Sequence, residues 1–328
     1  DYTSVSIWRN TSAGSISFAS RVDLSMTHTG NDVAIGDIDG DGKIDLVVTN
    51  NYGSNVSVFL NNSTIGTLSF APRVDLPAVA NVYGVKIGDI NGDGKNDIVT
   101  TNVTAGSCIS IFRNTGTATG TVSFATRSDF SNGTISSRWV ELGDIDMDGN
   151  LDLIVSNSEW IVSVFRNTSS GNTMSLATPV SSNYGWVVDR VNIGDLNGDS
   201  KPDIIIPRGG MVAILTNNST SGNIALTGQF DMGASGGGGM QSIEVVDLDL
   251  DGKLDMFNGG DNTKIDFYRY SPPPPPPPTI TNFTPKSGSV GTTVTITGTN
   301  FNTTAANNIV FFGATKATVT AATATSMT

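Results

Sequence analysis

One string of residues returns five times along this chain of 328 residues. It follows the pattern D-x-[DN]-x-D-[GS]-x-x-D, and its first aspartates are separated by 52, 55, 51 and 52 residues. A repeat of this length indicates an array of similar supersecondary units, each packed against its neighbours. The five strings, named loops 1 to 5, are residues 37–45, 89–97, 144–152, 195–203 and 247–255.

Four short apolar segments accompany each string. Around loop 1 they read "DVAIGDI" before it, then "DLVVTN", "NVSVFLN" and "SFAPRVDL" after it. They are rich in β-branched residues and bounded by Gly, Asn and Ser, which is typical of β-strands, and no stretch has a sustained helical period. Four antiparallel strands per unit of about fifty residues predict an all-β fold, a β-propeller of four-stranded blades over residues 1–270.

The spacing of the aspartates within each loop predicts a cation site. Alternate side chains of a tight loop point inward, so positions 1, 3 and 5 converge. Gly at position 6 permits the sharp turn, the carbonyl of position 7 faces inward, and the Asp at position 9 closes the cage. Hard oxygen ligands in this number suit Ca²⁺ better than Mg²⁺. The predicted ligands are Asp37, Asp39, Asp41, Lys43, Asp45, Asp89, Asn91, Asp93, Lys95, Asp97, Asp144, Asp146, Asp148, Asn150, Asp152, Asp195, Asn197, Asp199, Lys201, Asp203, Asp247, Asp249, Asp251, Lys253 and Asp255, the position-7 residues through their carbonyls.

The charge balance supports calcium. Of the 30 acidic residues 27 are Asp, and 18 of these stand at the predicted ligand positions. Five Ca²⁺ ions would add +10 and take the formal net charge from −12 to −2. Ordinary Asp-Gly hairpin turns are the alternative for a single loop, but five loops in register disfavour it. The string resembles half an EF-hand without being one, because position 12 of loop 1 is Val48 and strand-like segments flank it.

The five sites are not expected to be equal. Loop 4 has Ser200 where the others have Gly, and a non-Gly residue held at positive φ costs about 1 kcal/mol. We therefore predict that loop 4 binds calcium most weakly. Loop 5 keeps its four aspartates but has Val246 where the other loops are preceded by Gly.

The unit resembles the FG-GAP/VCBS repeat family, whose members build calcium-binding β-propellers and of which the integrin α-subunit head is a distant relative. The resemblance covers residues 4–270, and it implies calcium ligands at the matching loop positions. The Phe-Gly and Gly-Ala-Pro signature of the family is only echoed here, in "SFAPRVDL".

The two ends of the repeat region are incomplete. The chain begins with a third and a fourth segment, "SVSIWRN" and "SISFASRVDL", and the last repeat stops after its third, "KIDFYRY". We expect four whole blades, a leading half and a trailing three-quarters. Either further blade sequence upstream in the parent completes a ring, of seven blades as in related proteins, or a neighbouring chain adds the missing strand and the protein polymerises.

A different composition follows the repeats. Pro272–Pro278 are seven consecutive prolines, so residues 271–279 are expected to be a stiff polyproline II spacer, with a ligand for a proline-binding module as the alternative. Residues 280–328, beginning "ITNFTPKSGSVGTTVTITGTNF", resemble an IPT/TIG domain, an immunoglobulin-like β-sandwich. The stop at "SMT" predicts that this domain is partial.

These observations favour an extracellular or cell-surface protein, bacterial in composition, that serves as a calcium-stabilised surface, adhesion or fibre-forming module. Its expected partners are other surface proteins, glycans or further copies of itself. The acidic charge disfavours nucleic acid, and no apolar run approaches the roughly 18 residues that membrane insertion needs. With His28 and Cys108 each the only residue of its type, zinc or His-based catalysis is not expected, nor an enzyme.

The alternative function is a lectin or a carbohydrate-binding module of a secreted polysaccharide-active protein. Aromatic residues recur near the segments opposite the loops, namely Tyr83, Trp139, Tyr184 and Trp186. Aromatic faces suit sugar rings, whereas the competing interpretation is that these side chains pack between blades.

Overall fold

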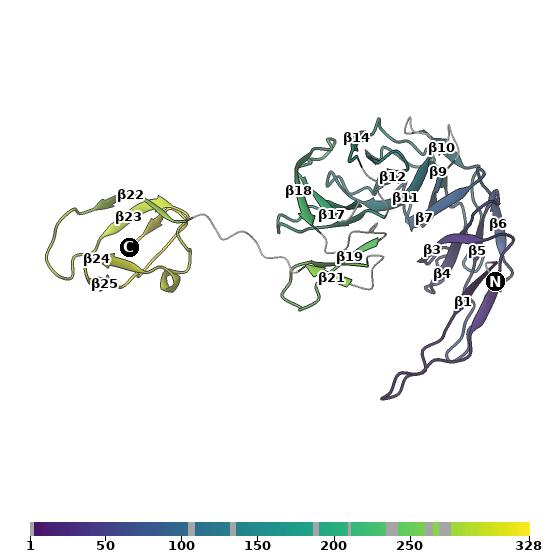
Figure 1. Cartoon of the computed structure of the whole chain (residues 1–328), viewed down its shortest axis with the longest axis horizontal. Coiled ribbons are helices and arrows are strands. Elements are labelled where there is room, and N and C mark those ends of the chain that lie inside the picture. Colours follow the sequence, from purple (N-terminus) through teal and green to yellow (C-terminus); the bar gives the residue numbers. More distant parts are fainter. Residues whose placement is uncertain are drawn as a thin grey trace. The chain divides into compact units, whose positions relative to one another are not determined.

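A computed structural model of the chain describes residues 3–103, 109–131, 136–185, 190–208, 211–233, 242–259, 265–268 and 277–328. The chain divides into two compact units, Asp1–Tyr270 and Ser271–Thr328, which are drawn in Figure 1. Cys108, Trp186 and most of the proline run lie outside the described residues. No helix in the described part of the chain is long and apolar enough to cross a membrane.

Four four-stranded antiparallel sheets repeat along the first unit, and in each of them the strands pair in chain order. We name these sheets blades 1 to 4. Blade 1 contains β3 (Gly30–Gly36), β4 (Asp45–Asn50), β5 (Asn55–Phe59) and β6 (Val74–Pro77), and blade 2 contains β7 (Val82–Gly88), β8 (Asp97–Asn102), β9 (Ile109–Phe112) and β10 (Ser128–Phe130). Blade 3 contains β11 (Ser137–Gly143), β12 (Asp152–Asn157), β13 (Ile161–Phe165) and β14 (Val180–Asn183), and blade 4 contains β15 (Asn192–Gly194), β16 (Asp203–Arg208), β17 (Met211–Asn217) and β18 (Leu226–Gly233).

Two smaller sheets flank the four blades. β1 (Ser4–Ile7) pairs with β2 (Val22–Ser25), and β19 (Ser242–Val246), β20 (Asp255–Gly259) and β21 (Ile265–Tyr268) form a sheet of three. Within the described residues this confirms the predicted leading half and trailing three-quarters. The segment between β1 and β2 exposes the large apolar side chains of Trp8, Ile16 and Phe18.

The hydrophobic core lies between successive blades. The second strands are almost wholly buried, and each cluster of buried residues draws on two neighbouring sheets. Val47 and Val58 of blade 1, for example, share a cluster with Val85 and Ile98 of blade 2. A strand of alternating β-branched residues can bury both of its faces only if a sheet covers each face. Figure 1 shows the sheets following one another around a common centre, which is the arrangement of a β-propeller.

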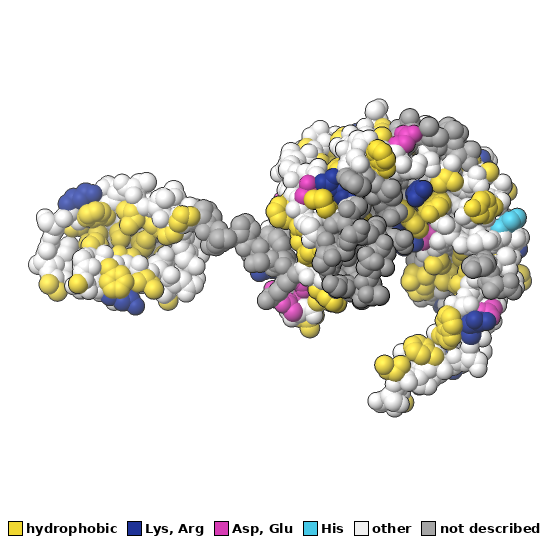
Figure 2. All heavy atoms as spheres, in the orientation of Figure 1, with side chains coloured by type: hydrophobic (Ala, Val, Ile, Leu, Met, Phe, Trp, Pro, Cys, Tyr) yellow, Lys and Arg dark blue, Asp and Glu magenta, His cyan; other side chains and the backbone are white. Residues whose placement is uncertain are grey.

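The second unit is a small β-domain. Its strands are β22 (Thr279–Thr284), β23 (Thr295–Thr299), β24 (Val310–Phe312), β25 (Thr315–Ala317) and β26 (Ser326–Met327), with one 3₁₀ turn at Ala305–Asn307. They form two sheets, β22–β23–β26 and β24–β25, around a core of Ile296, Phe301 and Met327. Figure 2 shows hydrophobic side chains gathered on the face of this unit that the view presents.

Candidate functional site

Each of the five aspartate loops connects the first two strands of its sheet. The residue before each loop pairs with the Asp at position 9, as Gly36 does with Asp45 and Gly88 with Asp97. Because the first two strands pair in the same register in every sheet, the five loops lie at corresponding ends of their sheets. The loops are therefore equivalent in structure as well as in sequence.

Each loop turns twice through the left-handed backbone region. Gly42, at position 6 of loop 1, has φ = 82°, as predicted for this position, and Gly40, at position 4, has φ = 74°. The requirement at position 4 was not predicted from the sequence. Loop 4 carries Ser200 at φ = 69°, which confirms its expected conformation, but Met147 in loop 3 and Leu250 in loop 5 are left-handed too, at 59° and 60°. Backbone strain therefore affects loops 3, 4 and 5, and the weakness of loop 4 stays a prediction.

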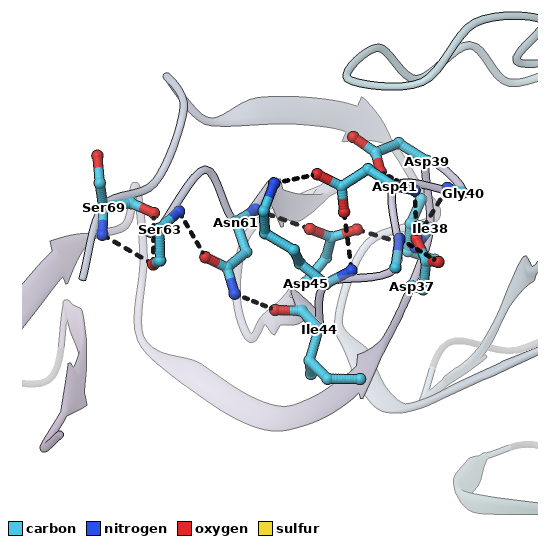
Figure 3. A network of polar contacts seen from close by, with 12 residues as sticks. Asp37, Ile38, Asp39, Gly40, Asp41, Ile44, Asp45, Asn61, Ser63 and Ser69 are labelled. Atoms are coloured by element: carbon cyan, nitrogen blue, oxygen red, sulfur yellow. Dashed lines mark hydrogen bonds and ion pairs between the residues drawn. The ribbon is translucent and has the colours of Figure 1, made fainter. Parts of the chain in front are cut away.

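The first aspartate organises the loop backbone. Asp37 Oδ1 accepts hydrogen bonds from the N–H groups of Gly40 and Asp41 at 2.8 and 3.1 Å, and its Oδ2 accepts one from Gly42 at 2.9 Å. The same bonds to positions 5 and 6 recur in loops 2, 3, 4 and 5. A loop wound around its first carboxylate holds the other acidic side chains close together (Figure 3).

Three loops bring three carboxylates to one point. In each, oxygen atoms of three Asp side chains lie within 4.8 Å of one another. The groups are Asp37, Asp39 and Asp41 in loop 1, Asp144, Asp146 and Asp152 in loop 3, and Asp247, Asp249 and Asp251 in loop 5. Loops 2 and 4 have Asn91 and Asn197 at position 3, and no group of three carboxylates meets there within the described residues. Of these three groups, only the one in loop 3 includes the Asp at position 9.

The side chains at position 7 contact the loops in ways that the sequence did not predict. Lys43 Nζ lies 2.5 Å from Asp41 Oδ2, and this hydrogen bond lowers the pKa of the Asp41 carboxyl. Asn150 Nδ2 donates to Asp148 Oδ1 at 2.8 Å. A cation bound to loop 1 would compete with the Lys43 ammonium for the Asp41 carboxylate. The inward-facing carbonyl at position 7 stays a prediction.

The aspartate at position 9 joins two parts of the blade. Asp97 is fully buried and accepts hydrogen bonds from the backbone N–H groups of Ile90, in the loop, and Asn114, after the third strand, at 3.0 and 2.7 Å. Asp45, Asp152 and Asp203 make the same two bonds. Burial raises the pKa of Asp97 and of Asp152 to about 6, although the backbone N–H groups oppose the shift. Figure 3 shows Asp45 lying between loop 1 and Asn61.

An asparagine after the third strand links neighbouring blades. Asn167 Nδ2 donates to the carbonyl of Leu151, within its own blade, at 2.9 Å and to that of Ile90, in loop 2, at 2.7 Å. Asn114 and Asn217 make the equivalent bonds to loops 1 and 3. We call these residues the linking asparagines. Sequence reasoning missed them, although an Asn ends the third segment in "VFLN", "IFRN", "VFRN" and "ILTN".

The hairpin between the third and fourth strands also reaches the preceding loop. The N–H of Gly222 in blade 4 donates to Asp146 Oδ2 of loop 3 at 2.8 Å. In blade 3 the carbonyl of Gly171 accepts from Asn91 Nδ2 of loop 2 at 2.6 Å. The position-3 side chain therefore contacts the next blade, so a cation held by this residue would be coupled to the interface between two blades.

The aromatic residues of the alternative hypothesis lie in different environments. Tyr83 and Trp139, on the first strands of blades 2 and 3, are partly exposed and pack edge to face with ring centres 5.0 Å apart. Tyr184 is 7% exposed and belongs to the core between blades 3 and 4, so it presents no surface to a sugar. His28 is exposed and lies in an irregular segment.

The donor set fits calcium. The converging groups are carboxylate oxygens of loops 1, 3 and 5, and no sulfur or imidazole group takes part among the described residues. Such ligands favour Ca²⁺ or Mg²⁺ over softer metals, and an irregular group of this kind suits the flexible coordination of Ca²⁺. The residues that would hold the ion are Asp37, Asp39 and Asp41 in loop 1, Asp144, Asp146 and Asp152 in loop 3, and Asp247, Asp249 and Asp251 in loop 5. The ligands named for loops 2 and 4, and Asp148 at position 5 of loop 3, stay predictions.

Structural comparison finds several similar folds. A lectin of Agrocybe aegerita that recognises non-reducing terminal N-acetylglucosamine is 22% identical, with a TM-score of 0.47 over 68% of this chain. The exotype rhamnogalacturonan lyase YesX (19%, TM-score 0.44) and the rhamnogalacturonan lyase YesW (18%, TM-score 0.46) match over 73% and 82% of this chain. The chain spans 59%, 47% and 53% of the lengths of these three proteins. No curated protein sequence matches it.

Two family models match the sequence. The IPT/TIG domain model matches residues 278–328. The model of the FG-GAP-like repeat matches five overlapping stretches, residues 1–48, 37–100, 89–155, 144–206 and 195–257. Each of these stretches contains at least one of the aspartate loops described above. Since the repeat model accounts for most of the chain, this protein belongs to the FG-GAP-like repeat family and carries an IPT/TIG domain after its repeats.

Proposed function

We propose that the protein is a calcium-stabilised module of an extracellular surface or adhesion protein, a segment of a longer multidomain chain. One observation carries the proposal. The aspartate loops are repeated in register, and loops 1, 2 and 3 are each tied to the next blade by a linking asparagine, Asn114, Asn167 or Asn217. FG-GAP repeats commonly bind calcium, and ions at these positions would stabilise both the loops and the contacts between blades.

Calcium removal tests this proposal directly. The unfolded chain cannot hold a preformed cage, so ion binding stabilises the folded state by mass action. EGTA should lower the melting temperature substantially, excess Ca²⁺ should restore it, and Mg²⁺ should restore it poorly. A melting curve that does not respond to EGTA would refute the calcium assignment. Surface location is tested separately, by cleavage with an added protease on intact cells of the native source.

The proposal assigns the module a structural and binding role, with other surface proteins, glycans or further copies of the chain as partners. Among the described residues the sheets β1–β2 and β19–β20–β21 have fewer strands than the blades, and a strand from another chain could extend them. Sedimentation over a range of concentrations tests self-assembly. A monomer at every concentration would remove the fibre-forming version of the proposal and leave the adhesion version.

Carbohydrate binding is the second candidate function. The observation that favours it is the pair of partly exposed aromatic rings, Tyr83 and Trp139, at the end of the first strands opposite the loops. Their mutual packing across two blades supports the competing structural role equally. A glycan array probed with the wild-type protein and the Trp139→Ala variant distinguishes the two, because only a sugar-binding site loses its signals in a variant that still folds.

A further inference from the structure

Residues from four blades meet at the end of the first strands that is opposite the aspartate loops. Asp32 lies on β3, Tyr83 on β7 and Trp139 on β11, and Arg190 stands two residues before β15. The Arg190 side chain reaches Asp32, 158 positions away in sequence, with 2.5 Å between Nη2 and Oδ1. The group therefore lies where the first strands of blades 1 to 4 approach one another. We call it the axial cluster.

The guanidinium of Arg190 is held in a defined orientation. Its central carbon lies 4.1 Å from the centre of the Trp139 ring, and Asp32 pairs with one of its nitrogens. Asp32 is itself fixed, because its side chain is only 6% exposed and its other oxygen accepts the N–H of Val85 at 3.0 Å. An arginine restrained on two sides loses little side-chain entropy when it binds a further group.

The same guanidinium remains open to solvent. The Arg190 side chain is 45% exposed, and a guanidinium carries five N–H donors in a planar fork. Asp32 is its one ion-pair partner within the described residues. A second cation, Arg138, lies 5.9 Å from the centre of the Tyr83 ring, and no residue that the structure describes forms an ion pair with it. Within the described residues the axial cluster therefore holds two guanidinium groups and one carboxylate.

We propose that the axial cluster binds the carboxylate of an acidic saccharide, a uronic acid residue within an otherwise neutral glycan. Arginine recognises a carboxylate by paired, charge-assisted hydrogen bonds, and a fixed arginine does so at lower entropic cost. The partly exposed Tyr83 and Trp139 rings beside it supply apolar surface for a sugar ring. This inference rests on the second candidate function and names its ligand class.

The composition of the axial cluster favours a glycan with spaced charges over an acidic peptide or a polyanion. Arg190 already pairs with Asp32, so its guanidinium has room for one further carboxylate and not for a run of them. A single uronic acid brings one carboxylate and several neutral hydroxyl groups. Trp139 also has a buried indole N–H without an acceptor among the described residues.

The proposal is tested by titrating the calcium-loaded full chain with methyl glucuronoside, its carboxyl methyl ester and methyl glucoside. NMR line shifts and tryptophan fluorescence report binding, and Trp139→Phe identifies the contribution of that indole among the four tryptophans. We expect the free acid to bind at least about tenfold more tightly than its ester, because the uncharged ester cannot form charge-assisted hydrogen bonds with the Arg190 guanidinium. Arg190→Gln should remove this preference, and Arg190→Lys should restore only part of it.

Control variants separate recognition from folding. Arg21→Gln removes an exposed arginine that pairs with Asp23 far from the cluster, and it should leave binding unchanged. Because Arg190→Gln leaves the buried Asp32 carboxylate unpaired, the double variant Asp32→Asn/Arg190→Gln and the single variant Arg138→Gln are measured as well. Melting temperatures in calcium establish which of the variants are folded.

Each result has a defined meaning. Equal binding of acid and ester, or an acid preference that survives in the folded Arg190 variants, would overturn the inference and leave carbohydrate binding intact. If no saccharide binds, acidic or neutral, the inference and the second candidate function both fail. Tighter binding of a glutamate-containing peptide, with the same dependence on Arg190, would replace the saccharide by a protein partner.

Discussion

Replacing Asn167 by Ala should destabilise the propeller unit through the contact between blades 2 and 3. The side chain is 1% exposed and makes three hydrogen bonds, to the carbonyls of Ile90 and Leu151 and from the N–H of Ser169, at 2.7 to 2.9 Å. At about 1 kcal/mol for each bond, the variant should lose roughly 3 kcal/mol of unfolding free energy. The backbone bond from Asn167 to Asp152 is unaffected, because alanine keeps its N–H.

Asn61 provides a matched control. It occupies the same position in blade 1 and bonds to Ile44 and Ser63, at 2.9 and 3.0 Å, but it makes no bond to a preceding loop within the described residues. Asn61→Ala should therefore lose roughly 2 kcal/mol, and the difference of about 1 kcal/mol measures the bond between blades. The carbonyl of Ile90, left without this donor, could enlarge that difference, because Ile90 is 1% exposed.

Urea unfolding in saturating Ca²⁺, followed by far-UV circular dichroism, gives both free energies. The slope of free energy against urea is compared first, since a repeat protein can lose two-state behaviour and a changed slope would reveal it. If Asn167→Ala lies within about 0.5 kcal/mol of the wild type, or if Asn61→Ala is equally destabilising, the linking role assigned to this residue is wrong.

Three further predictions follow from the loops and the first strands. Asp93→Ala should lower the melting temperature in Ca²⁺ more than Asp199→Ala, because loop 4 is predicted to bind the ion more weakly; the reverse order would contradict the ranking. In EGTA the free energy of unfolding, measured by urea titration at each pH, should rise as the pH falls from about 6 toward 4. Burial raises the pKa of Asp97 and Asp152 to about 6, so the folded state takes up protons at a higher pH than the unfolded state does. In Ca²⁺ the same acidification should shrink the stabilisation by the ion, because protons compete for the loop carboxylates. Gly84→Ala should destabilise the folded protein far more than Gly42→Ala. A Cβ at residue 84 would lie 2.6 Å from the Arg138 carbonyl oxygen, whereas a Cβ at residue 42 would meet open space and only the left-handed backbone opposes alanine there. Equal melting temperatures for the two variants would contradict this account.

Local features of the sequence were sufficient to predict the repeat, the strands and the loops. The aspartates at positions 1, 3 and 5 stand close together in the chain, so their convergence follows from the turn itself. Position 6 was recognised because Gly occurs there in four loops, whereas position 4 was not, because Met147 and Leu250 conceal its left-handed backbone. Gly40, Gly92 and Gly198 stand at position 4 of loops 1, 2 and 4, so the signal was present in three loops and obscured in the other two.

Contacts between distant residues could not be derived in this way. The bond from Asn167 to Ile90 ends on a backbone carbonyl, and every residue offers one, so no pattern of side chains identifies the acceptor. The pairing of Asp32 with Arg190 depends on the arrangement of the blades around their centre, which sets which first strands approach one another. The burial of Tyr184 likewise depends on the neighbouring blade, which covers a side chain that the sequence placed among surface aromatics.

The choice of acceptor by the linking asparagines bears on how such a protein evolves. Duplication of one repeat inserts a new blade between two existing blades. Any contact between blades that depends on a matched pair of side chains would then have to evolve again at both new interfaces. A contact from an Asn side chain to a main-chain carbonyl needs no matching side chain, since the acceptors here are the carbonyl groups of Ile38, Ile90 and Ile145. A copied repeat therefore brings the donor for one junction and the acceptor for the next, and genes of this family can gain or lose blades by recombination without compensating substitutions at this contact.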